Sequence, residues 1–305
     1  MSILEIDHLS KSFGANQVLN QISLTVPEKT IFGFIGQNGA GKTTTMKIIL
    51  GLLKPDAGTI RVCGETVRYG QTKTNRHIGY LPDVPEFYGY MTPREYLRLC
   101  GEITGLPGPV IKKRSAELIS LVGLEKANRR IAGFSRGMKQ RLGIAQALIN
   151  QPSLLICDEP TSALDPVGRK ELLDILEQVK GQTTVLFSTH ILSDVERICD
   201  RIALLNKGQI ALCGTIAELK AQHRQDGLAV EFATTAEGQV FVTELRRRDG
   251  RLKIDIDGGK IVMRTADVRW AAQTAIDILA QQQLLPVKLE MLEPSMETLF
   301  LEVVQ

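Results

Sequence analysis

A glycine-rich octapeptide near the N-terminus constrains the fold of this chain more than any other feature. It has the pattern G-x-x-x-x-G-K-T and reads Gly36-Gln37-Asn38-Gly39-Ala40-Gly41-Lys42-Thr43. A short apolar run (30–35) precedes it, as a buried strand would, and residues 43–53 carry apolar side chains at helical spacing. In this context, backbone N–H groups and a helix N-terminus bind phosphate. The pattern predicts a nucleoside triphosphate site that includes Thr44, with Lys42 on the β- and γ-phosphates and Thr43 on Mg²⁺.

Paired acids at the end of a second apolar run supply a metal ligand and a base. Residues 154–157 are apolar and lead directly into Asp158 and Glu159. A buried strand would hold Asp158 at the sheet edge, where its carboxylate binds Mg²⁺ directly or through water. Glu159 can then accept a proton from the attacking water. The alternative is a strand that ends in solvated acids.

A histidine follows the next predicted strand. His190 comes directly after the run 185–189. Alone, a histidine at a strand end more often has a structural role than a catalytic one. Beside a phosphate loop it becomes a candidate for bonding the γ-phosphate and orienting the water or Glu159. We therefore predict Glu159 and His190 as catalytic residues.

Composition narrows the classes of function. The chain has 305 residues, 43% hydrophobic and 23% charged, and its net charge of +3 is too small to argue for nucleic acid. No apolar run approaches the roughly eighteen residues of a membrane span, and the N-terminus lacks the pattern of a signal peptide. The five scattered cysteines have no metal-ligand spacing and are typical of reduced thiols in a cytosolic protein.

Hydrophobic periodicity predicts an α/β chain with two domains. Residues 1–26 alternate like two strands, and residues 92–149 are helical from a capping box that starts at Thr92. Buried parallel strands and a helix fill 154–189, and a hairpin is expected over 202–212. A polar linker at 221–227 would separate a domain over 1–220 from a small α+β domain over 228–305. In that second domain we expect strands at 228–233, 251–257, 260–264 and 284–291, and helices at 267–282 and 294–303.

The order of these motifs resembles that of the ATP-binding subunits of ABC transporters. The resemblance covers residues 1 to about 220, from the phosphate loop through a helical segment (84–150) and the acidic pair to His190. It implies a P-loop NTPase fold of the ABC ATPase type, with an N-terminal antiparallel β subdomain and a helical subdomain. It also implies ATP as substrate and Mg²⁺ as cofactor.

The resemblance adds three further sites. Residues 134–138 are similar to the family's signature loop, in which Ser135 and the Gly137 amide would close on ATP held by a second subunit; read alone, Ser135 is an ordinary helix N-cap. Phe13 occupies the position where the family stacks an aromatic ring on adenine, and a core phenylalanine is the alternative. Residues 162–165 resemble the loop that couples the two sites of the dimer, called the D-loop.

Two departures from the family pattern stand out. The signature has Arg136 in place of the first glycine and Met138 in place of glutamine. At Asp83 the family usually has glutamine, so a second carboxylate would lie near Mg²⁺, where it strengthens metal binding or repels an unscreened γ-phosphate. This acidic residue and the altered signature resemble the exporter subgroup of the ABC-2 type, which handles drugs, antibiotic peptides, sodium or polysaccharide.

The resemblance implies an ATPase that is peripheral on the cytoplasmic face of the cell membrane and has two kinds of partner. One is a second ATP-binding subunit, identical or a close paralogue; the other is a separate multi-span permease, which contacts the transported substrate. Residues 84–90, with three aromatics, match the surface that receives a permease helix; packing within the helical subdomain is the alternative. The extension 228–305 resembles that of the exporter subgroup, with a role in dimer contact or regulation.

Two other functions are weighed against this one. A soluble ABC-type ATPase acting on ribosomes or DNA usually has paired ATPase domains, coiled coils or basic arms, none of which this sequence contains. A non-hydrolysing ATP switch would require Asp83 and the altered signature to disable turnover.

Overall fold

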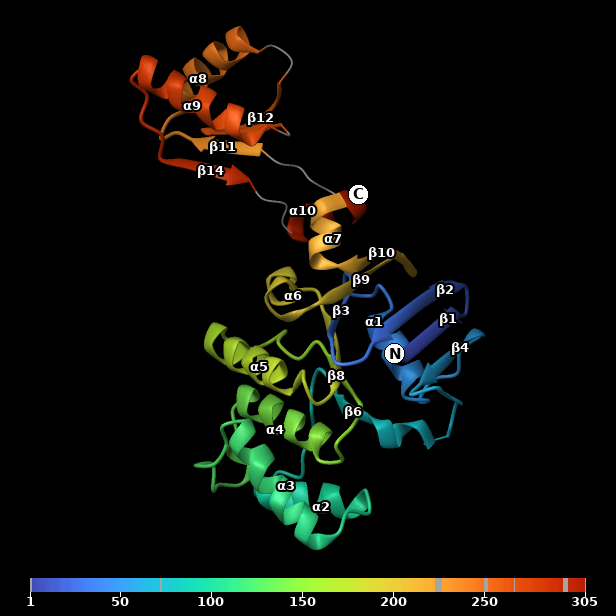
Figure 1. The fold of residues 1–305 in the computed structure, drawn as a ribbon. Helices are drawn as coiled ribbons and strands as arrows, with labels where there is room; N and C mark the ends of the chain where they lie inside the picture. Colours follow the sequence, from blue (N-terminus) through green and yellow to red (C-terminus); the bar gives the residue numbers. More distant parts are fainter. Residues whose placement is uncertain are drawn as a thin grey trace. The chain divides into compact units, whose positions relative to one another are not determined.

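The computed structural model describes residues 2–71, 73–222, 227–249, 252–265, 267–292 and 296–304 (Figure 1). The chain divides into two units, Met1–Ile216 and Ala217–Gln305. Residues 223–226 of the predicted linker lie outside the described residues. No helix within the described ranges is long and apolar enough to cross a bilayer.

A six-stranded sheet forms the centre of the first unit, in the order β10-β9-β3-β8-β7-β6. Its neighbours are parallel except for the β9–β10 hairpin. Every residue of β3, β7 and β8 is buried, as continuous apolar runs predict for strands covered on both faces. The strands are β3 (Ile31–Ile35), β6 (Ile78–Leu81), β7 (Leu154–Asp158), β8 (Thr184–Thr189), β9 (Arg201–Asn206) and β10 (Gln209–Thr215).

The predicted N-terminal hairpin belongs to an antiparallel sheet of order β2-β1-β4-β5. Its turn contains Gly14, whose φ of 59° suits glycine. The alternating apolar residues of β1 and β2 bury against β3 and the helix α1 (Lys42–Ile49) in one core. The phosphate loop therefore leaves the parallel sheet and runs beside the antiparallel one. The strands are β1 (Ser2–Phe13), β2 (Asn16–Pro27), β4 (Ala57–Val62) and β5 (Glu65–Thr66).

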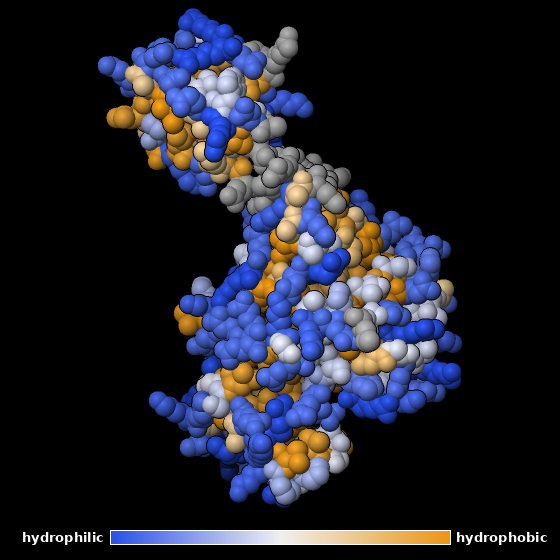
Figure 2. Space-filling model, viewed as in Figure 1, coloured by the Kyte–Doolittle hydropathy of each residue, from blue (hydrophilic) through white to orange (hydrophobic). Residues whose placement is uncertain are grey.

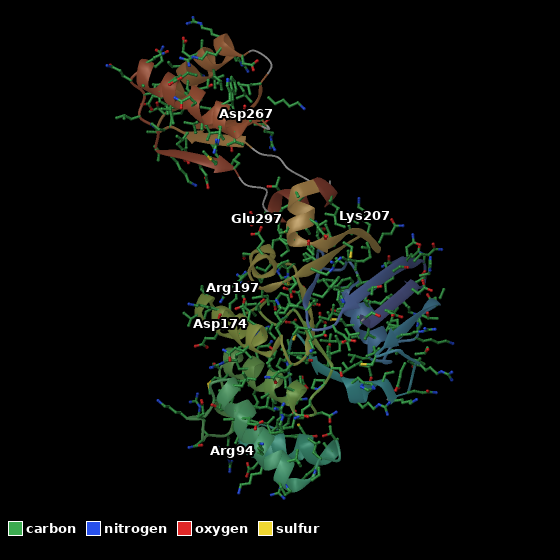
Figure 3. The ribbon with its side chains drawn as sticks, viewed as in Figure 1. Arg94, Asp174, Arg197, Lys207, Asp267 and Glu297 are labelled. Atoms are coloured by element: carbon green, nitrogen blue, oxygen red, sulfur yellow. The ribbon has the colours of Figure 1, made fainter. Side chains whose placement is uncertain are left out.

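Helices of the first unit share a second core with the parallel sheet. The predicted capping box is confirmed, because Thr92 Oγ1 accepts from Glu95 N and the Glu95 carboxylate accepts from Thr92 N. An ion pair between Asp174 and Arg197 joins two of the helices (Figure 3). The helices are α2 (Pro93–Ile103), α3 (Gly108–Leu121), α4 (Arg136–Leu148), α5 (Pro166–Val179) and α6 (Leu192–Ile198), with 3₁₀ turns at Lys73–His77 and Ile131–Gly133.

The second unit contains a β-α-β-β-α-β arrangement with an antiparallel sheet of order β12-β13-β11-β14, a ferredoxin-like topology. The sequence prediction located its four strands but gave no bounds for the helix α8 (Thr235–Arg248). The capping box of Thr234 and Glu237 was the signal for that helix. The other elements are α7 (Ile216–Gln222), β11 (Gly227–Glu231), β12 (Lys253–Asp257), β13 (Lys260–Arg264), α9 (Val268–Gln281), β14 (Lys288–Leu292) and α10 (Met296–Val304).

Candidate active site

The phosphate loop needs glycine for conformation and for space. Gly39 and Gly41 have φ of 84° and 111°, in the left-handed region that other residues rarely adopt. A Cβ at Gly36 would lie 2.6 Å from the Leu205 carbonyl oxygen, which cannot move aside as a flexible side chain can. Gly41 is also the N-cap of α1, and no side chain of the described residues caps this helix. The first N–H groups of α1 are therefore available to an anion.

Lys42 is buried, with 5% of its side chain exposed. Its Nζ donates to the carbonyl oxygens of Gly36, at 2.6 Å, and Gln37, at 3.2 Å. The same Nζ lies 3.1 Å from Glu159 Oε1. The loop backbone thus fixes the ammonium at a point where it faces a carboxylate.

Thr43 and Asp158 meet as predicted. Thr43 Oγ1 donates to Asp158 Oδ2 at 2.8 Å, and Ser188 Oγ donates to Asp158 Oδ1 at 2.7 Å. Asp158 and Ser188 are directly paired on the parallel strands β7 and β8. Sequence reasoning missed Ser188, although adjacent parallel strands end at the same sheet edge. The contact holds the buried Asp158 carboxylate in one orientation.

Glu159 and His190 are also brought together. Glu159 Oε2 lies 2.8 Å from His190 Nδ1, and the Glu159 N–H donates to Ser188 Oγ and to the Ser188 carbonyl oxygen. The Glu159 side chain is 13% exposed and that of His190 is 42% exposed. A φ of 48° at Glu159 turns the chain sharply after β7. This turn directs the carboxylate toward Lys42 on one side and His190 on the other.

Asp83 is placed differently from the other predicted metal ligands. Its Oδ1 accepts from Ser162 Oγ at 2.9 Å and lies 3.7 Å from Arg136 Nη2. Its carbonyl oxygen accepts from Nε2 of the buried Gln140 at 2.5 Å. Within the described ranges, these contacts connect it to the D-loop and the signature loop, and no hydrogen bond joins it to Thr43. The metal-ligand role of Asp83 stays a prediction.

The remaining predicted residues lie at the surface. Phe13 is half exposed at the end of β1, with Lys11 Nζ 5.3 Å from its ring centroid, so it is not a core phenylalanine. Ser135 caps α4 by accepting from Met138 N at 3.2 Å. Gly137 is open, since among the atoms of the described residues a Cβ there would meet only Leu164 Cδ2, at 3.8 Å. In the described part of the chain, no hydrogen bond joins Ser135 or Gly137 to the phosphate loop.

A buried acid that the sequence did not single out braces the segment after Glu159. Asp194 is 2% exposed and accepts from Thr161 Oγ1 at 2.7 Å and from Arg169 Nε at 2.5 Å. Arg169 also donates to Ser193 Oγ at 2.7 Å. This network ties Thr161, the residue before the D-loop, to α5 and α6. A lone acid within a helix carries no sequence signal for such a role.

Comparisons with known proteins identify the family of this chain. A family model described as "ABC transporter" matches residues 19–162. The chain is 42% identical over 237 residues to the ABC transporter ATP-binding protein YxlF of Bacillus subtilis, covering 77% of this chain and 79% of that protein. The chain belongs to the ABC transporter ATP-binding proteins. The predicted function of an ATP-binding and ATP-hydrolysing transporter subunit is thereby confirmed.

Two more comparisons show how much of the chain is similar to known proteins. The linearmycin resistance ATP-binding protein LnrL of Bacillus subtilis is 33% identical over 312 residues, covering 98% of this ABC ATPase and 97% of LnrL. A solved structure of an ATP-binding subunit of an ABC transporter superposes with a TM-score of 0.65 at 35% identity, over 72% of this chain and 93% of that one. The predicted ABC ATPase fold is confirmed, and these relatives give no support to a soluble ATPase acting on ribosomes or DNA.

Proposed function

We propose that this ABC ATPase drives export through a separate permease, using Glu159 as the base that activates water. The observation that carries the proposal is the line of contacts from Lys42 through Glu159 to His190. The Glu159 carboxylate accepts the proton of a water that attacks the γ-phosphate in line. His190 orients that carboxylate, and Lys42 neutralises charge that develops on the phosphate oxygens.

Magnesium fits the residues beside this line of contacts. Mg²⁺ prefers oxygen ligands and usually takes one or two carboxylates while the substrate phosphates and water complete its shell. The Thr43 hydroxyl and the Asp158 carboxylate are such donors, 2.8 Å apart. Within the described residues, no group of three or more histidines, cysteines and acids could hold a metal unaided. This donor set suits a metal that would arrive with ATP, and such a metal would supply positive charge to the phosphate oxygens.

A second ATP-binding subunit would complete the site. Ser135 and Gly137 stand at the N-terminus of α4, and the open space at Gly137 lets an anion approach the backbone. We propose that they contact the γ-phosphate of ATP bound to the phosphate loop of the other subunit. Phe13, with its exposed ring, would stack on the adenine.

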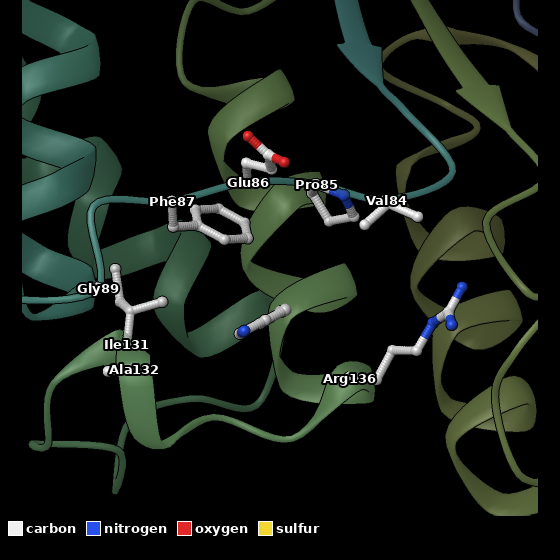
Figure 4. A pocket seen from close by; sticks show the side chains of 9 residues that line it. Val84, Pro85, Glu86, Phe87, Gly89, Ile131, Ala132 and Arg136 are labelled. Carbon is white, nitrogen blue, oxygen red and sulfur yellow. The ribbon is translucent and has the colours of Figure 1, made fainter.

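A groove in the helical part of the first unit suits a permease segment. It encloses about 470 Å³ and lies between the chain after β6 and the start of α4 (Figure 4). Most of its lining residues are apolar, and Glu86, Arg136 and Lys139 supply charges. Of the aromatics in the adjoining loop, Phe87 packs edge-on against Tyr96, whereas Tyr88 and Tyr90 are more than half exposed. We propose that a short cytoplasmic helix of the permease docks here and places the ATPase at the membrane.

Co-purification from detergent-solubilised membranes tests this proposal. The affinity-tagged wild-type chain should retain a multi-span protein that has no ATPase domain of its own. Val84→Glu puts a charge into the groove at a residue that is 62% exposed, so the fold should survive while the permease is lost. Val167→Glu on α5, at a residue 66% exposed, is the matched control and should retain the permease. Wild-type chain without a multi-span partner, or equal retention by Val84→Glu, would contradict the proposal.

A further inference from the structure

The strand β14 is an open edge of the sheet in the second unit. It pairs antiparallel with β11 on one side, and no described strand pairs with its other side. An unpaired edge presents a row of N–H and C=O groups to any strand of matching register. Natural proteins usually cover such an edge or blunt it with charge.

The edge also exposes a row of apolar side chains. Leu289 and Met291 are opposite the core residues Val230 and Leu228, so they lie on the helix-bearing face of the sheet. Helix α9 packs on β11 and α8 on β13, which leaves Leu289 39% and Met291 58% exposed. Val287, two residues earlier, is 66% exposed. Apolar surface on this unit is visible among its charged side chains in Figure 2.

The charges on the strand make it complementary to itself. Lys288 and Glu290 alternate with the apolar residues and therefore lie on the opposite face of the strand. Lys288 Nζ is 2.5 Å from Glu290 Oε2. In an antiparallel pair of two copies centred on Leu289, each Lys288 faces the other copy's Glu290 and each Val287 faces the other copy's Met291. A register centred on Lys288 would place the Lys288 side chains of the two copies opposite each other, and one centred on Glu290 would do the same with the two Glu290 side chains. The register centred on Leu289 therefore pairs opposite charges on one face of the sheet and apolar side chains on the other.

We propose that β14 is a homodimer contact: two copies of this chain pair antiparallel through the strand and join their four-stranded sheets into one of eight. Such a contact is isologous, with the same patch on both subunits. It covers the exposed apolar row and pairs the open edge. It requires no nucleotide, and it is therefore separate from any closure of two ATPase domains over ATP.

Charge variants of the full-length chain test the register, with sedimentation velocity in EDTA and without nucleotide. Wild type should dimerise, and Lys288→Glu or Glu290→Lys should each weaken the dimer about tenfold or more, because like charges then face each other twice. The double swap should restore the dimer, and the two single variants mixed should form a heterodimer. Lys253→Glu on β12, the opposite edge of the sheet, is the matched control and should not change dimerisation.

Disulfide trapping gives a second readout that does not depend on charge. Leu289→Cys would place two thiols opposite each other across the two-fold axis and should yield a cross-linked dimer under mild oxidation. Ile256→Cys, at a residue 53% exposed on β12, should not. Wild type that sediments as a monomer at every concentration tested would overturn the proposal. Single charge variants that dimerise as tightly as wild type, or equal cross-linking of the two cysteine variants, would do the same.

Discussion

Lys42 and Glu159 face each other with 3.1 Å between Nζ and Oε1. Both side chains are largely buried, so salt screens their attraction only weakly. The ammonium is also held by two carbonyl oxygens of the phosphate loop, which fix its position independently of the carboxylate. A phosphate bound to Lys42 is therefore close to Glu159, as proton transfer from an attacking water requires.

Glu159→Gln should abolish turnover and leave ATP binding intact. The amide keeps the shape of the side chain but cannot take a proton, so we expect steady-state ATP hydrolysis to fall by about a hundredfold or more. ATP affinity, measured by calorimetry, should stay the same or rise slightly because a negative charge near the phosphates is removed. Glu177→Gln, at an exposed position on α5, is the control. Wild-type hydrolysis by Glu159→Gln would exclude Glu159 as the base.

His190→Asn should lower kcat more than it changes KM for ATP. Asparagine is too short to reach Glu159 Oε2, so the carboxylate loses the contact that orients it. We expect kcat to fall by about tenfold or more. His8→Asn on β1, at a side chain 70% exposed, should leave both constants unchanged. A His190→Asn variant with the wild-type kcat would leave His190 with a structural role only.

Asp158→Asn should weaken Mg²⁺-dependent ATP binding by about tenfold or more, since it removes the carboxylate beside Thr43. Asp83→Asn should weaken it less, because the Asp83 carboxylate contacts Ser162 and Arg136. Calorimetric titration of ATP at several Mg²⁺ concentrations separates the two variants. Equal losses in both would identify Asp83 as a second metal ligand.

Tyr80 should make folding stability sensitive to alkaline pH. Burial and the nearby Asp158 and Asp83 carboxylates raise the pKa of its phenol from 10.0 to about 12. The unfolded chain then loses this proton at lower pH than the folded chain, so this contribution to stability is complete below pH 10 and is lost as pH rises toward 12. Between about pH 9 and about pH 11, the free energy of unfolding measured with urea should fall less for Tyr80→Phe than for wild type. Tyr69→Phe, at a residue 59% exposed, should behave as wild type.

The convergence of Thr43, Asp158, Glu159 and His190 was predictable because each lies at, or in the segment beyond, the carboxyl end of a strand that the sequence identifies. Parallel strands bring their carboxyl ends to one edge of the sheet, so residues distant in sequence meet there without any detail of packing. The phosphate loop and the Thr92 capping box were predictable for a related reason. Their geometry is local and is encoded within a few residues.

Contacts that depend on the meeting of separate loops were not predictable. Asp83 and Ser162 lie in two separate loops and Arg136 begins α4, so their meeting depends on how α4 packs against β6. Ser188 belongs to an apolar run and reads as one more strand residue. The helix α8 was not delimited because charged and polar residues interrupt its apolar pattern, and its packing depends on Phe241 and Leu245, which join the core of the second unit.

The left-handed backbone at Glu159 limits how this position can change in evolution. With φ at 48°, a β-branched residue would strain the turn after β7, so such a change costs stability as well as activity. Glycine, asparagine and aspartate adopt this conformation most readily. A homologous subunit that has lost hydrolysis but still folds should therefore carry one of these three residues, or glutamine, more often than valine or isoleucine. The residue at this position in a homologous sequence can therefore be used to recognise inactive partners of such ATPases.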